Sequence, residues 1–66
     1  MQQVTIYTIG NVMEIECDYK ESLSDHIISA IDDGYIALNT IKGTQIIINT
    51  LNIVGIEIAE IEDEKT

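Results

Sequence analysis

The chain has 66 residues, with twelve acidic side chains, three lysines and no arginine, so its net charge is −9. Binding to nucleic acids requires cations that displace counterions from phosphates, and basic membrane-surface helices require them as well, so this composition excludes both classes. No run of about 18 apolar residues predicts a transmembrane helix and no signal peptide is recognisable. The expected location is therefore the cytoplasm, where the single cysteine stays reduced.

A chain this short buries only about 60% of the surface that it exposes when unfolded, so a further source of stability is expected. Cys17 is the only cysteine and cannot form an intramolecular disulfide, and no cluster of cysteines and histidines indicates a structural zinc. The residue pattern indicates no other metal and no cofactor. Association with further copies remains, and the sequence predicts a homo-oligomer.

Two strands, residues 4–9 and 12–19, are predicted to form a hairpin around a Gly10-Asn11 turn. The second strand alternates apolar and acidic residues, as a half-buried strand does. A two-residue loop at this turn pairs Ile6 with Ile15 and Val4 with Cys17. The apolar side chains then share one face, which comprises Val4, Ile6, Met13, Ile15 and Cys17.

A helix is predicted over residues 21–33, because apolar residues recur there at the spacing of one helical face. That stripe comprises Leu23, Ile27, Ala30 and Ile31. Ser22 is the expected N-cap, with Asp25 three residues later, and Gly34 is the expected C-terminal stop.

Three further strands are expected, followed by a charged tail at residues 62–66 that is predicted to be disordered. The strands cover residues 35–40, 44–49 and 53–61, with a Lys42-Gly43 turn, a short break at 49–52 and a bulge or close backbone approach at Gly55. Residues 1–61 thus form a single domain of the α+β class. Its predicted order is ββαβββ, with one short helix packed on a small antiparallel sheet or a partly open small barrel.

The segment TQIIINTLNIVGIEI, residues 44–58, resembles the last two strands of Sm-like and SH3-like small barrels, which a one-turn break joins. The helix here lies between strands two and three, and the basic RNA-facing loop residues of Sm proteins are missing, so the resemblance implies a fold but no RNA binding. As a whole, the chain resembles short, acidic, isoleucine-rich accessory proteins of phages and prophages of low-GC bacteria. Many of those bind and block a component of the host cell.

The acidic residues offer the first candidate surface. Glu14, Glu16 and Asp18 project from one strand face about 7 Å apart, and Asp32 and Asp33 lie at the negative end of the helix dipole. A solvated face is the plainest interpretation. A surface that binds a basic partner protein is the functional alternative, and such a surface could also mimic the phosphates of DNA. A metal site is a weaker alternative, because evenly spaced carboxylates along a strand do not converge on one point.

The nearly uncharged block at residues 34–56 offers two more candidates. The Lys42-Gly43-Thr44 loop can present backbone N–H groups and a cation to a phosphate, as in a sponge for a nucleotide signal, unless it is only a hairpin turn. Because interface cores are poor in charge, the strands of this block are also expected to build the oligomer. The predicted interface residues are Tyr35, Ile36, Leu38, Ile46, Ile47 and Ile48.

No catalytic residues are predicted. His26 lies on the helix flank away from the apolar stripe, where no strained nucleophile or oxyanion hole is expected beside it. Cys17 faces inward in an acidic strand and is expected to behave as a small buried apolar residue. The sequence therefore predicts a non-enzymatic, homo-oligomeric binding protein that sequesters or blocks a host protein or a small ligand, with a DNA mimic and a nucleotide sponge as alternatives.

Overall fold

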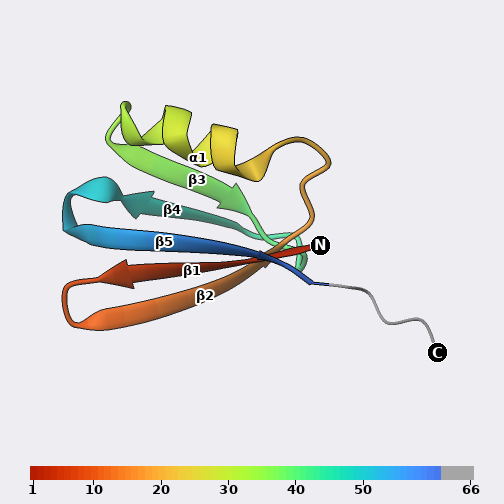
Figure 1. Cartoon of the computed structure of the whole chain (residues 1–66), viewed down its shortest axis with the longest axis horizontal. Helices are drawn as coiled ribbons and strands as arrows, with labels where there is room; N and C mark the ends of the chain where they lie inside the picture. The colour runs from red at the N-terminus through yellow and green to blue at the C-terminus, as the bar shows by residue number, and fades with distance from the viewer. Residues whose placement is uncertain (62–66) are drawn as a thin grey trace.

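The computed structural model describes residues 1–61, which form two antiparallel sheets and one helix (Figure 1). The larger sheet has the order β2-β1-β5, and the smaller sheet consists of β3 and β4. The strands are β1 (Gln2–Thr8), β2 (Asn11–Cys17), β3 (Tyr35–Asn39), β4 (Gln45–Asn49) and β5 (Ile53–Glu60). The helix α1 (Leu23–Ile31) lies between β2 and β3 in the chain, and the 3₁₀ turn η1 (Thr50–Asn52) joins β4 to β5. The α+β class is confirmed, whereas the predicted tail at residues 62–66 lies outside the described residues.

The core consists of nine apolar side chains contributed by both sheets and by α1. They are Val4, Ile6, Ile15, Cys17, Leu23, Ile27, Ile36, Leu38 and Ile48. The helix lies along β3 and far from β2, as Figure 1 shows. The burial of Cys17 agrees with the structural role that the sequence predicted for it.

The first hairpin has a different turn from the predicted one. Its loop consists of Ile9 and Gly10, so Thr8 pairs with Asn11, Ile6 with Met13 and Val4 with Ile15. Gly10 has a φ of 88° and takes the second loop position, where a type II turn requires a positive φ. The predicted loop was one residue too late and the predicted pairing was wrong by two residues. A shift of two preserves the faces, so the predicted inward set still shares one face.

The helix is two residues shorter at each end than predicted, but the predicted N-cap and the predicted glycine stop flank it. The Ser22 hydroxyl accepts the N–H of Asp25 at 3.3 Å and caps the N-terminus. At the other end, Gly34 has a φ of 89° and donates its N–H to the carbonyl of Ile31 at 3.1 Å. Such a left-handed glycine is a common helix stop.

The last strand interrupts its ladder at one position. Tyr7 pairs with Gly55 but Thr8 pairs with Ile53, so Val54 is left without a partner, next to the glycine at which a bulge was predicted. On the other side of β1, β2 ends at Cys17 because Gln2 opposite it is the first residue of β1. The predicted strand over residues 12–19 was therefore two residues too long.

Gln2 joins the end of β2 to the start of the helical segment. Its side-chain Nε2 donates to the Tyr19 carbonyl at 3.0 Å, while its Oε1 accepts the Tyr19 N–H at 2.9 Å. Nε2 also lies 3.4 Å from a carboxylate oxygen of Glu60. The buried amide of Gln2 thus makes the same pair of hydrogen bonds with the Tyr19 backbone that a neighbouring strand would make beyond the end of β2.

The free edge of β3 is covered by two side chains. Nε2 of His26 lies 3.1 Å from the carbonyl of Ala37, and the Tyr19 hydroxyl accepts the N–H of Asn39 at 3.1 Å. The two rings contact each other with centroids 5.4 Å apart. Unpaired strand edges invite pairing with other chains, so His26 has a structural role here that its position on the helix flank did not predict.

Candidate functional site

A polar hollow of about 470 Å³ lies between the edge of β2 and the loop that joins β3 to β4. The loop reaches the strand through a hydrogen bond of 3.0 Å from the Ile41 N–H to the Glu16 carbonyl. We call this the β2 hollow; its polar lining residues are Gln3, Glu14, Glu16, Thr40, Lys42 and Thr44. The structure therefore brings together two predicted sites, the acidic strand and the Lys42 loop, that are far apart in the sequence.

The charges of the β2 hollow disfavour an anionic ligand. Two carboxylates, Glu14 and Glu16, line it together with one ammonium group, Lys42, so the lining carries one net negative charge. A free phosphate there would be attracted by one charge and repelled by two. The arrangement suits a neutral or cationic group better.

The loop itself does not offer the backbone donors that a phosphate site needs. The N–H groups of Lys42 and Thr44 donate to the Thr40 hydroxyl oxygen at 3.2 and 3.4 Å, and the N–H of Gly43 donates to the Thr40 carbonyl at 3.1 Å. All three donors of the predicted phosphate loop are therefore used within the turn. The interpretation as a hairpin turn fits this geometry, and a phosphate would have to displace these hydrogen bonds in order to bind the loop.

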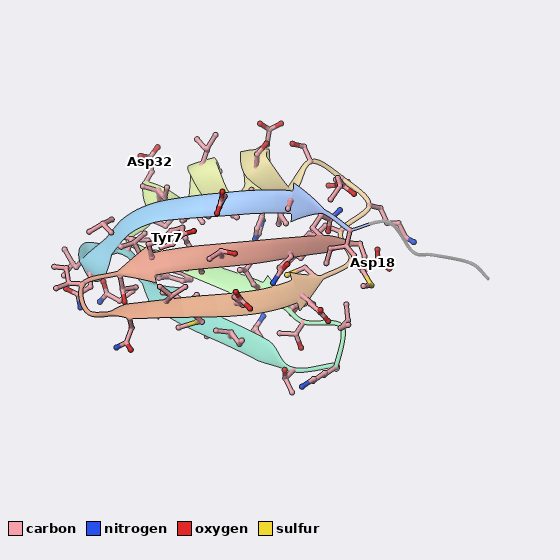
Figure 2. All side chains as sticks on the ribbon, turned by 60° about the horizontal axis from the view of Figure 1, so that its bottom comes forward. Tyr7, Asp18 and Asp32 are labelled. Carbon is pink, nitrogen blue, oxygen red and sulfur yellow. The ribbon has the colours of Figure 1, made fainter. Side chains whose placement is uncertain are left out.

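The five acidic residues predicted to meet a partner do not form one surface. Asp18 lies beyond the end of β2, and its carboxylate pairs with the N-terminal ammonium group at 3.7 Å. Asp32 lies at the opposite end of the molecule from Asp18 (Figure 2), and Asp33 follows it in the turn after α1. Only Glu14 and Glu16 share a strand, so the predicted acidic surface is reduced to its first two members.

A third carboxylate, which the sequence analysis did not include, joins them on the outer face of the larger sheet. Thr5 of β1 pairs with Glu14 on one side and with Glu57 of β5 on the other. Two strand spacings place these carboxylates about 10 Å apart across the sheet. Only the strand order β2-β1-β5 reveals this, because 43 residues separate the two positions in the chain.

Tyr7, labelled in Figure 2, lies on the same outer face and bonds to this third carboxylate. Its hydroxyl donates to Oε1 of Glu57 at 2.8 Å. That hydrogen bond raises the pKa of Tyr7 above its usual value, and the negative charges of Glu57 and Glu14 raise it further. The phenol thus stays neutral and acts as a donor on this face.

Replacing Glu57 by glutamine is expected to lower the pKa of Tyr7 towards its usual value, because ionisation would no longer place a phenolate against a carboxylate. Phenolate absorbance during an alkaline titration measures this, and the difference between each protein and its Tyr7→Phe form isolates Tyr7 from the other two tyrosines. Glu14→Gln serves as the control with a smaller decrease. Equal pKa values in the native and Glu57→Gln proteins would contradict the hydrogen bond.

Half of the predicted oligomer interface is buried within the single chain. Ile36, Leu38 and Ile48 are at most 8% exposed and belong to the core, so they cannot meet a second copy. Ile46 packs against the core as well. Tyr35 and Ile47 remain, with 52% and 65% of their surface exposed. The absence of charge in this block therefore reflects mainly the chain's own core.

His26 and Cys17, the two side chains considered for catalysis, both have structural contacts. His26 lies against a backbone carbonyl and a tyrosine ring. Burial raises the pKa of the Cys17 thiol, which disfavours the reactive thiolate. Within residues 1–61, no three side chains of the types that bind metals come together.

Large apolar side chains are exposed where the hairpin tip meets η1. The N–H of Ile9 donates to the Asn52 carbonyl at 3.2 Å, which joins the two segments. Ile9, Val12, Leu51 and Val54 are 61–86% exposed, and we call this group the apolar end. The sequence does not predict this group, because the alternation of strand residues does not reveal which turns lie side by side.

Val54 also lines an apolar groove of about 440 Å³ between α1 and β5. We call it the α1–β5 groove; isoleucines supply most of its lining, namely Ile27, Ile28, Ile31, Ile53, Ile56 and Ile58. Ile28 is 64% exposed and lies outside the predicted apolar stripe of the helix. The helix packs mainly on β3, so it leaves this side of β5 uncovered.

Comparison with protein-family models, curated proteins and solved structures gives no match. In the part of the chain that the structure describes, no helix has the length and apolar character needed to cross a membrane. The candidate functional surfaces are therefore the β2 hollow, the outer acidic face, the apolar end and the α1–β5 groove.

Proposed function

We propose that the protein is a non-enzymatic, homo-oligomeric binding protein that acts by occlusion, as an accessory factor of the phage type that blocks a host protein or a small ligand in the cytoplasm. The apolar end is the observation that carries this proposal. Four large apolar side chains are exposed there at one end of a small domain, and exposed apolar surface of this kind is typical of a region that another molecule covers.

The distribution of charge and the contact between the two sheets support the oligomer and its barrel-like shape. The apolar end contains no charged side chain, so a second copy can cover it without burying a charge. The two sheets would act as a partly open small barrel, and the hydrogen bond from Ile41 to Glu16 supports this because it joins the β3–β4 loop of the smaller sheet to the edge of β2. The surfaces away from the apolar end would remain free for the target.

Native mass spectrometry of the full chain at micromolar concentration tests the oligomer. Replacing Leu51, which is 86% exposed, by aspartate leaves the core intact and should raise the dissociation constant about a hundredfold, since burying an unpaired carboxylate costs about 3 kcal/mol. Ser29→Asp, which adds the same charge on an exposed helix position, should change nothing. A monomeric native protein would refute the oligomer.

A DNA mimic remains a second candidate, because Glu14, Glu16 and Glu57 share the outer face of the larger sheet. Binding through that face would weaken steeply with added salt, as contacts between exposed charges do. Replacing the three glutamates by glutamine would weaken the binding as well, because it removes the same charges. Partner binding that is insensitive to salt would contradict this candidate and leave occlusion by apolar contact.

A further inference from the structure

The free edge of β5 can be located from one hydrogen bond. The Ile61 N–H donates to the Met1 carbonyl at 2.8 Å, next to the pair Gln2 and Glu60. In an antiparallel ladder, alternate residues direct both backbone groups to the neighbouring strand. Ala59 and Glu57 therefore bond to β1, whereas Ile58 and Ile56 direct their N–H and C=O groups away from it. In the described part of the chain, no strand pairs with that side of β5.

This free edge borders the α1–β5 groove. The side chains of Ile56 and Ile58 line the groove while their backbone groups point along the sheet to its open side. Ile28 and Ile31 of α1 form the opposite wall, and they are 64% and 47% exposed. A strand edge facing a helix across an apolar groove is the geometry that takes up an extended peptide. The backbone provides affinity and pockets for alternate side chains provide specificity.

The charges around the groove select the kind of peptide. No charged residue lines it, but acids adjoin both walls, namely Asp25 and Asp32 next to lining residues of the helical segment and Glu60 two residues beyond Ile58 on β5. None of the lysines among residues 1–61 is part of the lining. An incoming segment should therefore alternate apolar residues with basic ones.

A second copy of the chain fits this groove poorly. It would bring another net charge of −9. Its β4 strand is uncharged and its β2 strand carries Glu14 and Glu16, so neither offers a cation to the acids of the rim. The charge complementarity thus favours a different protein with a net positive segment.

We infer that the α1–β5 groove is a docking site for an extended, apolar and basic segment of a partner protein, which adds a strand to the free edge of β5. The inference depends on the proposed function and specifies its target surface. The site is separate from the apolar end, except for Val54 at its border, so self-association and target binding can proceed together.

The test uses a synthetic peptide in which valine alternates with lysine, and a matched peptide in which valine alternates with glutamate. The lysine peptide should shift the backbone amide resonances of Ile56 and Ile58 in the full chain and slow their hydrogen exchange. The glutamate peptide should bind at least about tenfold more weakly than the lysine peptide. A lysine peptide whose backbone N–H groups on the edge that pairs with β5 are methylated should not bind.

Ile28→Asp provides the matched variant, because this side chain is exposed and its loss leaves the core unchanged. It should weaken binding of the lysine peptide at least about tenfold, while Ser29→Asp should not. Protection at Val12 and Glu14 on the edge of β2, equal binding of both peptides, or equal binding to the Ile28→Asp protein would each overturn the inference. Protection of Ile56 and Ile58 that appears without peptide as the protein is concentrated would overturn it in favour of a second copy.

The outcomes for the groove and for the proposed function are distinguishable. An oligomer by native mass spectrometry that fails to bind the lysine peptide refutes the groove and leaves the oligomeric binding protein standing. A monomer that binds the peptide at β5 supports the groove and refutes the oligomer.

Discussion

Replacing Ile6 by alanine is expected to remove about 2–5 kcal/mol from the free energy of unfolding, because it leaves a cavity that the surrounding strands cannot fill. Ile6 is fully buried in the central strand β1, between β2 and β5. Domains have about 0.05–0.15 kcal/mol of stability per residue, so this loss is comparable with the whole stability of so short a chain. The variant should be largely unfolded at 37 °C.

Urea denaturation followed by circular dichroism measures the effect. With a denaturant dependence of about 1 kcal/mol per molar for a small domain, the midpoint should fall by at least about 2 M. Ile9→Ala is the matched control, since the same residue type in the same hairpin is 75% exposed there. Equal midpoints for the two variants would show that the β1 face is not the core.

Replacing Gln2 by glutamate is expected to cost about 2–3 kcal/mol at neutral pH, because a carboxylate cannot donate to the Tyr19 carbonyl and a buried charge is left beside Glu60. The new carboxyl should have a pKa above its unfolded value, since the folded state disfavours its charged form. The cost is therefore fully present above that raised pKa and declines as the pH falls towards the unfolded value of about 4.3.

Thermal unfolding of this variant and of the native protein across pH 4–7.5 measures the difference between them. Gln3→Glu is the control, because it adds the same charge one residue later on the outer face and should cost less than about 1 kcal/mol. A difference between the Gln2→Glu and native proteins that does not change with pH would contradict a carboxylate as the cause.

Local features of the fold were predictable because their signals are local. The alternation of residues 12–17 identifies the inward face of β2, and a register error of two residues does not alter it. Ser22 and Gly34 mark the helix ends by their own chemistry. Ile36, Leu38 and Ile48 were predicted in an interface because their segment lacks charged residues. Such a segment is expected to be buried, but the sequence does not show whether the same chain or a second copy buries it.

The candidate sites depend on where distant segments meet, and no periodicity contains that information. The β2 hollow exists because Ile41 bonds to Glu16, and the groove exists because α1 packs on β3 and leaves β5 uncovered. The phosphate-loop prediction overlooked a more local feature. Three adjacent N–H groups were counted as free, but Thr40 accepts all of them.

The pairing of β1 with β5 also constrains when the protein can fold. Gln2 pairs with Glu60, so the central strand of the larger sheet is completed only by residues at the far end of the described chain. Closing such a long loop is slow compared with forming a helix or a hairpin. During synthesis, the hairpin of β1 and β2 would thus wait with one edge of β1 open until β5 has left the ribosome, and in that interval the nascent chain is most exposed to aggregation.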